Sequence, residues 1–226
     1  MRELLAAIAE SFQRNLIDGN AYQIVLKGLW VTVQISGLGL LLGTVFGAFL
    51  CAMRMSKIKI LSGFSKLIIS VLRGSPVLLL LMVLYYVVFA YSRINPVIIA
   101  VIGFTFNSGA HIAEMMRSAV EATDKKQLEA ARMLGFSRFK AFYYITLPQA
   151  ARISKPVFQS TIVNTIQWTF DVGYITITDL TRTVNNIGAR TGDPFFPLFF
   201  GILIYLALSY FVYALFSIGN KKGVSQ

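Results

Sequence analysis

Long apolar stretches alternate with short polar and basic segments along most of the chain. These stretches cover roughly residues 24–53, 67–91, 96–120, 150–171 and 194–218. A helix of about 20 apolar residues crosses the hydrocarbon core of a bilayer. The pattern therefore predicts an all-α integral membrane protein with about five transmembrane helices, built as a single transmembrane domain over residues 21–226.

The segment before the first apolar stretch has a different pattern. Its apolar residues recur every three or four positions, at Leu4, Leu5, Ile8, Phe12 and Leu16. Charged and polar residues such as Glu3, Glu10 and Arg14 occupy the positions between them. This spacing is typical of an amphipathic helix on a membrane surface. We expect residues 1–20 to form such a segment, which is too charged to cross the bilayer.

Composition supports a membrane protein. Of the 226 residues, 56% are apolar and 14% are charged, against about 25% charged in soluble domains. A soluble chain with a net charge of +11 would suggest nucleic acid. Here most loop Lys and Arg residues, such as Arg54, Lys57, Lys125 and Lys126, lie on one side of the predicted spans. That side is expected to be cytoplasmic, which places the N-terminus outside and the C-terminus inside, with no nucleic acid partner.

Few residues in the chain have side chains suited to catalysis or to metal binding. There is one cysteine, Cys51, and one histidine, His111, so a disulfide framework or a metal site within the chain is not expected. No GxxxxGK[ST] phosphate-binding loop occurs. We expect neither catalytic residues nor a metal site, and therefore no enzyme.

Three glycines in the first apolar stretch follow a GxxxG pattern. Gly39, Gly43 and Gly47 are four residues apart and place bare backbone on one helix face. This arrangement favours close packing of a second helix. The neighbour is either another helix of the same chain or a second copy.

The loop between the third and fourth stretches carries a spaced motif. Its fixed positions are Glu129, Ala130, Ala131, Gly135, Ile145, Leu147 and Pro148. The spacing resembles the EAA loop of bacterial ABC import permeases at every fixed position. Gly135 is expected to stop a short helix, and Pro148 to mark the re-entry of the chain into the bilayer.

Two further segments narrow the resemblance to the polar amino acid uptake permeases. Arg73-Gly74-Ser75-Pro76 is similar to an RG[TS]P segment of that family. The stretch from Asn107 to Arg117 resembles NSGAYxAExxR, with His111 in place of the tyrosine. The resemblance implies a type I ABC importer-like permease fold in the bacterial cytoplasmic (inner) membrane. It also implies a pathway for a polar amino acid or a related small zwitterionic or cationic solute, operated by alternating access.

The same resemblance implies partners. In the family, the EAA helix docks into a groove on an ATPase subunit, and two ATPase copies bind the ATP and Mg. We therefore expect an ABC ATPase dimer, a second permease copy or paralogue, an extracytoplasmic solute-binding protein and membrane lipid, with no cofactor in this chain. Two alternatives remain: a permease for a small polar solute other than an amino acid, and a passive membrane channel.

The chain departs from the family near the end of the fourth stretch. Many relatives carry a KDTSL-like segment where this chain has Gln167-Trp168-Thr169-Phe170-Asp171. In the family this region borders the translocation path. We assign the substrate pathway to Asn164, Gln167, Trp168, Thr169 and Asp171.

The acidic and aromatic residues of this segment suit a cation. Asp171 is suited to a substrate ammonium and the Trp168 ring to a cation, while Gln167 offers an uncharged hydrogen bond. Alternatively, Asp171 lies in outside water and only ends the helix, with Trp168 as an interfacial anchor.

A structural or gating role is expected for a further set of residues, namely Arg73, Gly74, Pro76, Asn107, Glu114 and Arg117. Glu114 and Arg117 are three residues apart, so they can pair on one helix face. On the outer side, Arg182, Arg190 and Asp193 are candidates for contacting the binding protein. The alternative is a solvated loop whose charges touch nothing.

Overall fold

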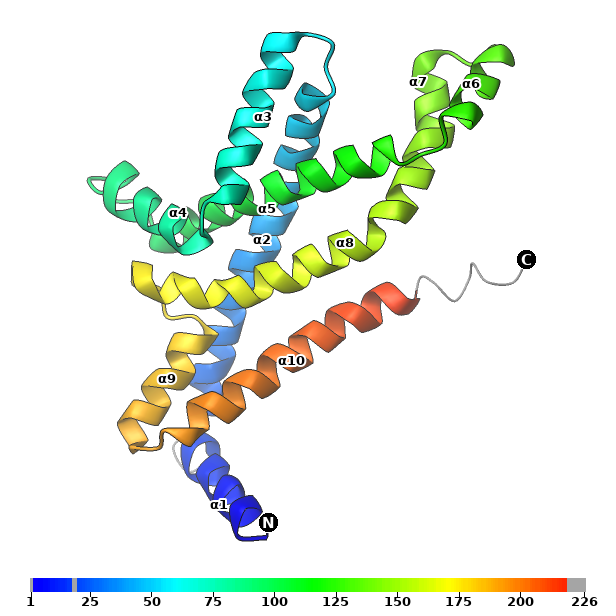
Figure 1. Cartoon of the computed structure of the whole chain (residues 1–226). Coiled ribbons are helices and arrows are strands. Elements are labelled where there is room, and N and C mark those ends of the chain that lie inside the picture. The colour runs from blue at the N-terminus through cyan, green and yellow to red at the C-terminus, as the bar shows by residue number, and fades with distance from the viewer. Residues whose placement is uncertain (1, 18–19, 219–226) are drawn as a thin grey trace. The chain divides into compact units, whose positions relative to one another are not determined.

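The computed structural model describes residues 2–17 and 20–218, and in this part of the chain the ordered elements are all helices. The α-helices are α1 (Arg2–Phe12), α2 (Tyr22–Arg54), α3 (Lys59–Gly74), α4 (Val77–Val83), α5 (Pro96–Glu121), α6 (Lys125–Met133), α7 (Arg138–Ala141), α8 (Leu147–Trp168), α9 (Leu180–Thr191) and α10 (Phe195–Ile218) (Figure 1). Three π-helical turns, η1 (Gln13–Ile17), η2 (Leu84–Val88) and η3 (Phe142–Thr146), and one 3-10 segment, η4 (Thr169–Ile175), connect them. The predicted all-α fold is confirmed.

Three of the described helices are long and apolar enough to cross a bilayer alone: α2, α5 and the Phe195–Phe216 part of α10. A fourth span results if α3 and the Val77–Val88 helix count as one bent pair. The predicted second span thus begins earlier, at Lys59, and it is broken where Ser75 has extended backbone. The predicted fourth span, α8, is not among the helices that meet these criteria. The number of five spans and their orientation remain predictions, and residues 219–226, expected to be cytoplasmic, lie outside the described residues.

The chain divides into two compact units that interleave along the sequence. The first unit takes residues 1–39, 76–104 and 162–226, and the second takes 40–75 and 105–161. Helices α2, α5 and α8 each contribute to both units.

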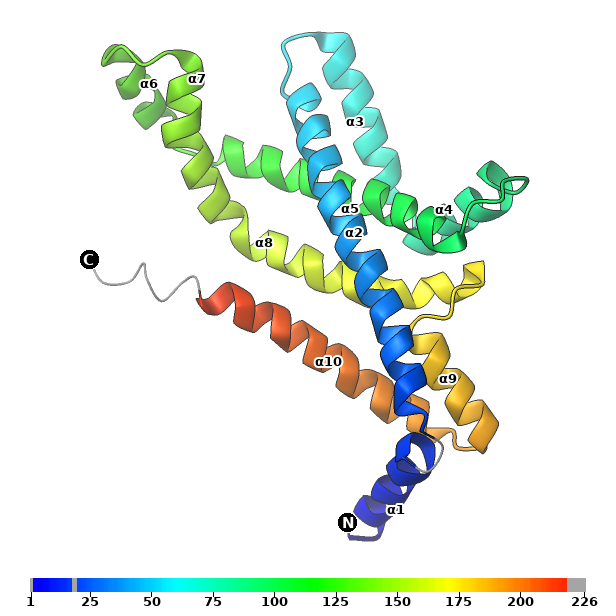
Figure 2. The same cartoon turned by 180° about the vertical axis from the view of Figure 1, so that it is seen from behind.

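Two apolar clusters form the core of the first unit. One gathers side chains from α2, α4, α5 and η4, including Ile35, Leu81, Phe104 and Val172. The other joins the start of α2 to α9 and α10, which lie side by side in both views of Figures 1 and 2. Helix α9 begins at Asp179, whose carboxylate accepts the backbone N–H groups of Thr181 and Arg182. This is the usual way a helix satisfies its first free donors.

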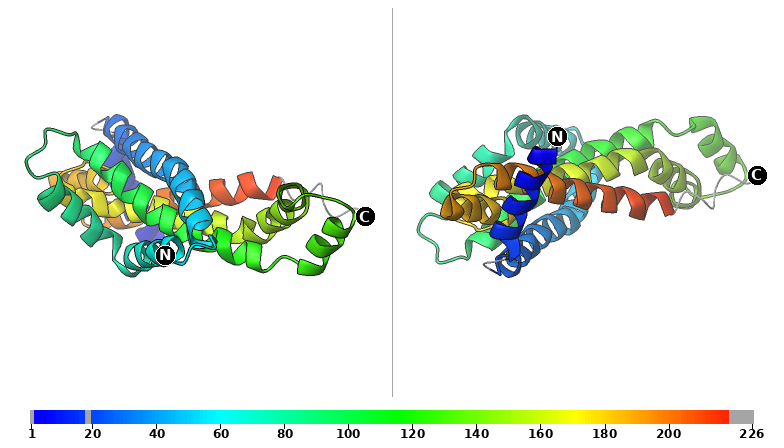
Figure 3. Two further views of the ribbon diagram at one scale, coloured as in Figure 1. Left: turned by 90° about the horizontal axis from the view of Figure 1, so that it is seen from above. Right: turned by 90° about the horizontal axis from the view of Figure 1, so that it is seen from below.

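The amphipathic N-terminal segment forms α1 followed by η1; Phe12 and Leu16 pack against the protein, whereas Ile17 is exposed. Phe12 meets Phe196 and Phe200 edge-on, with ring centroids 5.8 and 5.6 Å away. Leu16 packs on the apolar cluster between α9 and α10. Viewed from below, α1 crosses the N-terminal end of α10 (Figure 3). The side chains of Leu4 and Leu5 lie outside the described residues.

In the second unit, the C-terminal half of α2 packs against α3 and α5. Leu50, Cys51, Ile69 and Ala113 form its apolar cluster. The buried Ser65 hydroxyl of α3 donates a 2.7 Å hydrogen bond to the Leu50 carbonyl of α2, which fixes the two helices at close range.

The glycine stripe of α2 packs against α5 of the same chain, which settles the question of its neighbour. In the first unit, a Cβ built on Gly39 would lie 2.6 Å from the Phe104 Cβ. In the second unit, a Cβ on Gly47 would lie 2.6 Å from the Gly109 carbonyl oxygen. Both distances are too short for a methyl group, so the close approach of α2 and α5 requires glycine.

Candidate functional site

The motif between the third and fourth predicted spans folds as a short helix with defined ends. Helix α6 begins after Asp124, whose carboxylate accepts the backbone N–H of Lys126 at 2.9 Å. It ends before Gly135, which has a left-handed φ of +87°. The N–H of Phe136 then returns to the Ala131 carbonyl at 3.1 Å, which closes the helix end. The predicted helix stop at Gly135 is therefore present.

The motif residues differ in how accessible they are. Glu129 and Ala130 are exposed, whereas Ala131 is only 4% exposed and packs inward. Ala131 is buried because α6 rests on α7 and η3 along that face. Leu147 and Pro148 are exposed and Ile145 is half-buried.

Beyond the motif, this region exposes large apolar side chains that the motif alone did not indicate. Met133, Leu134 and Phe139 are 85%, 80% and 76% exposed. The Phe139 ring stacks on the half-exposed Tyr143 ring at 6.3 Å. We call these four residues the coupling patch. Exposed apolar patches of this kind mark protein contacts.

Phe139 and Tyr143 of the coupling patch lie on a helical run that continues into α8. Helical backbone continues from α7 through η3 into α8, with α6 packed beside α7 (Figures 1 and 2). Pro148 is the second residue of α8 and lies within this continuous helical run, so it cannot donate the backbone hydrogen bond that another residue would give to the preceding turn. The Gln149 amide donates to the Gln127 side chain at 2.7 Å, which ties α6 to α8.

The second unit holds a pocket of about 460 Å³ that is lined by apolar and polar side chains. The polar ones come from α3, α5 and α8, and they are Arg73, His111, Glu114, Ser118, Ser154 and Thr161. Arg73 lies in the last turn of α3, one residue before the helix ends at Gly74, and its exposed side chain reaches the pocket. The sequence motifs included Arg73, His111 and Glu114 but not Ser118, Ser154 and Thr161, which lie outside those motifs.

Glu114 and Arg117 form the ion pair expected from their spacing. The Arg117 guanidinium donates to both Glu114 oxygens, at 2.5 and 3.1 Å, and to Glu121 at 2.5 Å. The Arg117 guanidinium is thus shared by Glu114 and Glu121, which lie on the same face of α5.

The remaining residues of the structural set lie at helix breaks or in the interior. Gly74 ends α3 and Pro76 precedes α4, where a residue without N–H is tolerated. Asn107 is 3% exposed, and its side-chain oxygen accepts no hydrogen bond from the described residues.

The predicted pathway residues belong to the first unit and lie in different surroundings. Gln167 is exposed and lines a pocket of about 500 Å³ with Thr181, Asn185 and Tyr205. Trp168 instead packs on the apolar cluster of α4 and η4. Asn164 is exposed, and the buried Thr169 hydroxyl donates to the Ile166 carbonyl at 2.7 Å.

Asp171 is only 6% exposed, which does not fit a position in outside water. It lies in η4, after α8 has already ended at Trp168. This burial favours the pathway assignment over a solvated helix end, and the assignment remains a prediction. The Asp171 carboxylate is largely shielded from solvent, so its attraction to an oppositely charged group is stronger than in water.

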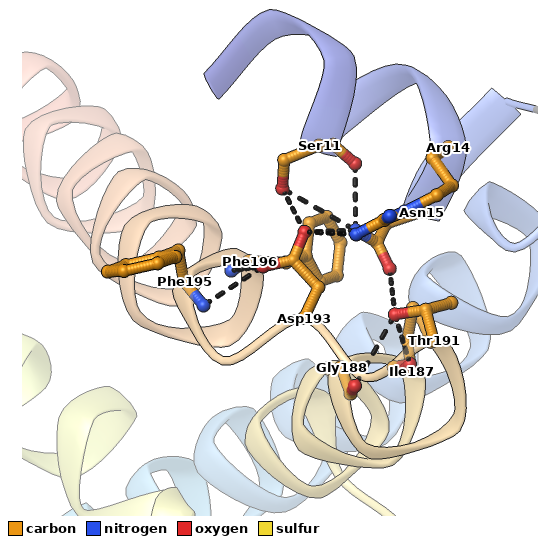
Figure 4. Close-up of polar contacts among 9 residues, drawn as sticks. All are labelled: Ser11, Arg14, Asn15, Ile187, Gly188, Thr191, Asp193, Phe195 and Phe196. Atoms are coloured by element: carbon orange, nitrogen blue, oxygen red, sulfur yellow. Dashed lines mark hydrogen bonds and ion pairs between the residues drawn. The ribbon is translucent and has the colours of Figure 1, made fainter. Parts of the chain in front are cut away.

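Two of the three residues proposed to contact a binding protein are engaged within the chain. Asp193 is 5% exposed, and its carboxylate meets Ser11, Arg14 and Asn15 (Figure 4). Arg182 donates a 2.6 Å hydrogen bond to the Gly173 carbonyl. Arg190 remains exposed on α9. The Asp193 contacts join residues about 180 positions apart, which no local pattern indicates.

The Asp193 carboxylate has a pKa lowered to about 2, chiefly because the Ser11 hydroxyl donates to it, with further donation from the Phe195 and Phe196 N–H groups and from Asn15. An ordinary aspartate has a pKa of about 3.9. The pKa of Asp193 is lower in the folded state than in the unfolded state. Ionised Asp193 therefore stabilises the folded state fully above about pH 4, and this stabilisation is lost as the pH falls toward 2.

We expect a spin label at Ala6 to keep one mobility from pH 7 to 5 and to become mobile only below about pH 4. Asp193→Asn should remove this pH dependence, and a transition near neutral pH would contradict the assignment.

Comparison with known proteins agrees with these features. Residues 39–222 match the family described as "Binding-protein-dependent transport system inner membrane component". The chain is 37% identical over 190 residues to the Bacillus subtilis (strain 168) protein named "Probable amino-acid ABC transporter permease protein YckA", covering 83% of this chain and 84% of that protein. It is 29% identical over 180 residues to the "L-cystine transport system permease protein TcyB" of the same organism, covering 79% and 77%.

A solved structure is also similar over most of its length. It is the "Crystal structure of an amino acid ABC transporter with histidines", with 28% identity, a TM-score of 0.82, and coverage of 89% of this chain and 94% of that chain. The family match covers most of the chain, including the glycine stripe, the short helix ending at Gly135 and the coupling patch. The chain therefore belongs to the family of inner membrane components of binding-protein-dependent transport systems.

Proposed function

We propose that this membrane subunit forms the translocation pathway of an ATP-driven importer for a polar amino acid or a related small zwitterionic or cationic solute. The observation that carries the proposal is the coupling patch, an exposed apolar surface at the end of α6 and on α7 and η3. Helical backbone continues from α7 through η3 into α8. The names of the relatives, which include amino-acid and L-cystine permeases, support the substrate class.

The partners follow from the same proposal. An ABC ATPase dimer binds ATP and Mg and receives α6, including Glu129 and Ala130, in a groove on each copy. A second permease copy or paralogue completes the pathway, and an extracytoplasmic binding protein delivers the solute. When ATP closes the ATPase dimer, α6 moves with it and α8 transmits the movement, so that the pathway opens outward; hydrolysis resets it inward.

Substrate recognition is assigned to two polar regions, one in each unit. In the second unit, the pocket of Arg73, His111 and Glu114 offers charges of both signs, which suits a zwitterion. In the first unit, the buried Asp171 carboxylate suits a substrate ammonium. Gln167 contributes an uncharged polar contact at its own pocket.

Asp171→Asn should weaken uptake of cationic amino acids more than uptake of neutral ones. Removing one charge of a close, partly buried ion pair weakens the affinity for a cationic substrate by roughly tenfold or more. The affinity for a substrate with a neutral side chain should fall much less. The measurement is competition for ATP-driven uptake in proteoliposomes that contain the complete importer, with lysine, arginine, glutamine and cystine as competitors.

Asp171→Glu is the matched control, because it keeps the carboxylate and should keep the preference. Equal half-saturation values for all competitors in the native protein and Asp171→Asn would refute the role of Asp171. Flux that proceeds without ATP would instead favour the passive channel, and competition only by solutes other than amino acids would favour the other permease class.

A further inference from the structure

The contacts around Asp193 divide between its two carboxylate oxygens (Figure 4). Oδ1 accepts the backbone N–H groups of Phe195 and Phe196, at 3.0 and 3.2 Å, and so caps the start of α10. Oδ2 accepts the Ser11 hydroxyl at 2.5 Å, the Asn15 amide at 2.9 Å and the Arg14 guanidinium at 3.1 Å. One oxygen therefore serves α10 and the other serves the N-terminal segment.

The same residue also closes α9. Gly192 has a left-handed φ of +68°, and the N–H of Asp193 returns to the Gly188 carbonyl at 3.0 Å. Gly188 has no room for a side chain, because a Cβ there would lie 2.7 Å from Pro197 Cδ and 2.9 Å from the Asp193 carbonyl oxygen. The turn between α9 and α10 is thus fixed by its own backbone, independently of α1.

Asn15 extends the contact to a second point on α9. It is 1% exposed, its amide nitrogen donates to the Ser11 carbonyl at 2.8 Å, and its side-chain oxygen accepts the Thr191 hydroxyl. Phe12 adds apolar contact with Phe196 and Phe200 on the neighbouring turn. Buried polar groups that are satisfied in this way fix one arrangement, because each alternative leaves a donor or acceptor unpaired.

We propose that Asp193 is a latch that locks the N-terminal segment onto the turn between α9 and α10, so that α1, α9 and α10 move as one body during the transport cycle. The N-terminal helix is then a fixed part of the first unit. It is not a mobile anchor that exchanges between protein and bilayer. This proposal holds for any transported solute and does not depend on the proposed function.

An isosteric substitution separates the latch from the cap of α10. In Asp193→Asn, the amide oxygen can still accept the Phe195 and Phe196 N–H groups at Oδ1. The amide NH₂ then occupies the position of Oδ2 and faces the Arg14 and Asn15 N–H groups, which cannot accept a hydrogen bond, and the Ser11 hydroxyl, which can. Two of the three contacts and the attraction to the Arg14 charge are lost, so the latch should open while the helix cap persists.

Hydrogen exchange of the assembled importer tests the latch. In Asp193→Asn, amides in residues 6–17 should exchange roughly tenfold or more faster, since lost charge-assisted hydrogen bonds are worth at least that factor, while α9 and α10 peptides keep their native rates. The control is Glu10→Gln, which removes an exposed carboxylate from the same helix. Unchanged protection of α1 in Asp193→Asn, or equal loss in Glu10→Gln, would overturn the proposal.

Two further variants keep the test decisive if Asp193→Asn fails to assemble. Ser11→Ala removes one donor and leaves the cap of α10 intact, so it should loosen α1 alone. Asn15→Asp combined with Asp193→Asn exchanges the carboxylate and amide, and should restore part of the protection lost in the single Asp193→Asn variant. Native protection of α1 in Ser11→Ala, or no restoration in an assembled exchange variant, would contradict the latch.

Movement as one body is tested by a distance within the importer. Spin labels at Ala6 and Ala189, both exposed, are introduced in a Cys51→Ala background and compared with and without ATP. The latch predicts one narrow distance distribution that ATP leaves unchanged, and a broad distribution in Asp193→Asn. A distance that shifts with ATP in the native sequence would show that α1 moves independently.

Discussion

Replacing Gly135 with proline is expected to reduce ATP-driven uptake by roughly tenfold or more, because proline in a position it cannot adopt costs about 3 kcal/mol. Gly135 has φ of +87°, whereas proline holds φ near −65°. No atom would lie within 4 Å of a Cβ at this position, so the effect arises from backbone conformation and not from crowding. The end of α6 must rearrange, and the coupling patch loses its fixed place beside α7. The measurement is uptake by the reconstituted importer, together with recovery of the ATPase on the purified permease.

Gly135→Asn is the matched control at the same residue. Asparagine enters the left-handed region more readily than other non-glycine residues, and open space surrounds the side chain. We expect this variant to retain most of the uptake rate. If Gly135→Pro preserved both assembly and ATP-driven uptake, the assignment of α6 as the ATPase-docking helix would be wrong.

Gly47→Ala is expected to lower the stability of the protein. The new methyl group would lie 2.6 Å from the Gly109 carbonyl oxygen and 3.1 Å from the Ala113 nitrogen. Both are backbone atoms of α5, so α2 and α5 must separate. Overpacking of this kind costs about 1–3 kcal/mol. The expected result is a lower thermal unfolding midpoint and a lower yield of monodisperse protein in detergent.

Gly37→Ala provides the comparison on the same helix. A Cβ at Gly37 meets nothing within 4 Å, and alanine favours helix over glycine by about 1 kcal/mol. Its unfolding midpoint should stay the same or rise. Equal midpoints for Gly37→Ala and Gly47→Ala would show that the close approach of α2 and α5 does not depend on glycine.

Local patterns predicted the features whose causes are local. Hydrophobic stretches indicated the helices, and the motif spacing located the stop at Gly135, because a left-handed residue after a helix favours glycine. The i, i+3 spacing of Glu114 and Arg117 likewise predicted their ion pair.

Features that depend on partners far away along the chain could not be predicted from sequence patterns. The glycine stripe indicated close packing but not that α5 was the neighbour. The burial of Asp171 depends on its place in η4, and the residues that engage Asp193 lie about 180 positions away. The inward turn of Ala131 required knowing how α6 rests on α7. Each case is a tertiary contact, which periodicity along the chain does not encode.

The proposed importer assembly is tested by purifying the tagged chain from its native membrane in mild detergent and identifying the accompanying proteins by mass spectrometry. We expect an ABC ATPase in the purified complex, with one permease sequence for a homodimer or two for a heterodimer. Loss of that ATPase from Gly135→Pro, but not from Gly135→Asn, would locate the contact at α6. Reproducible recovery of the folded permease without any ATPase would contradict the account.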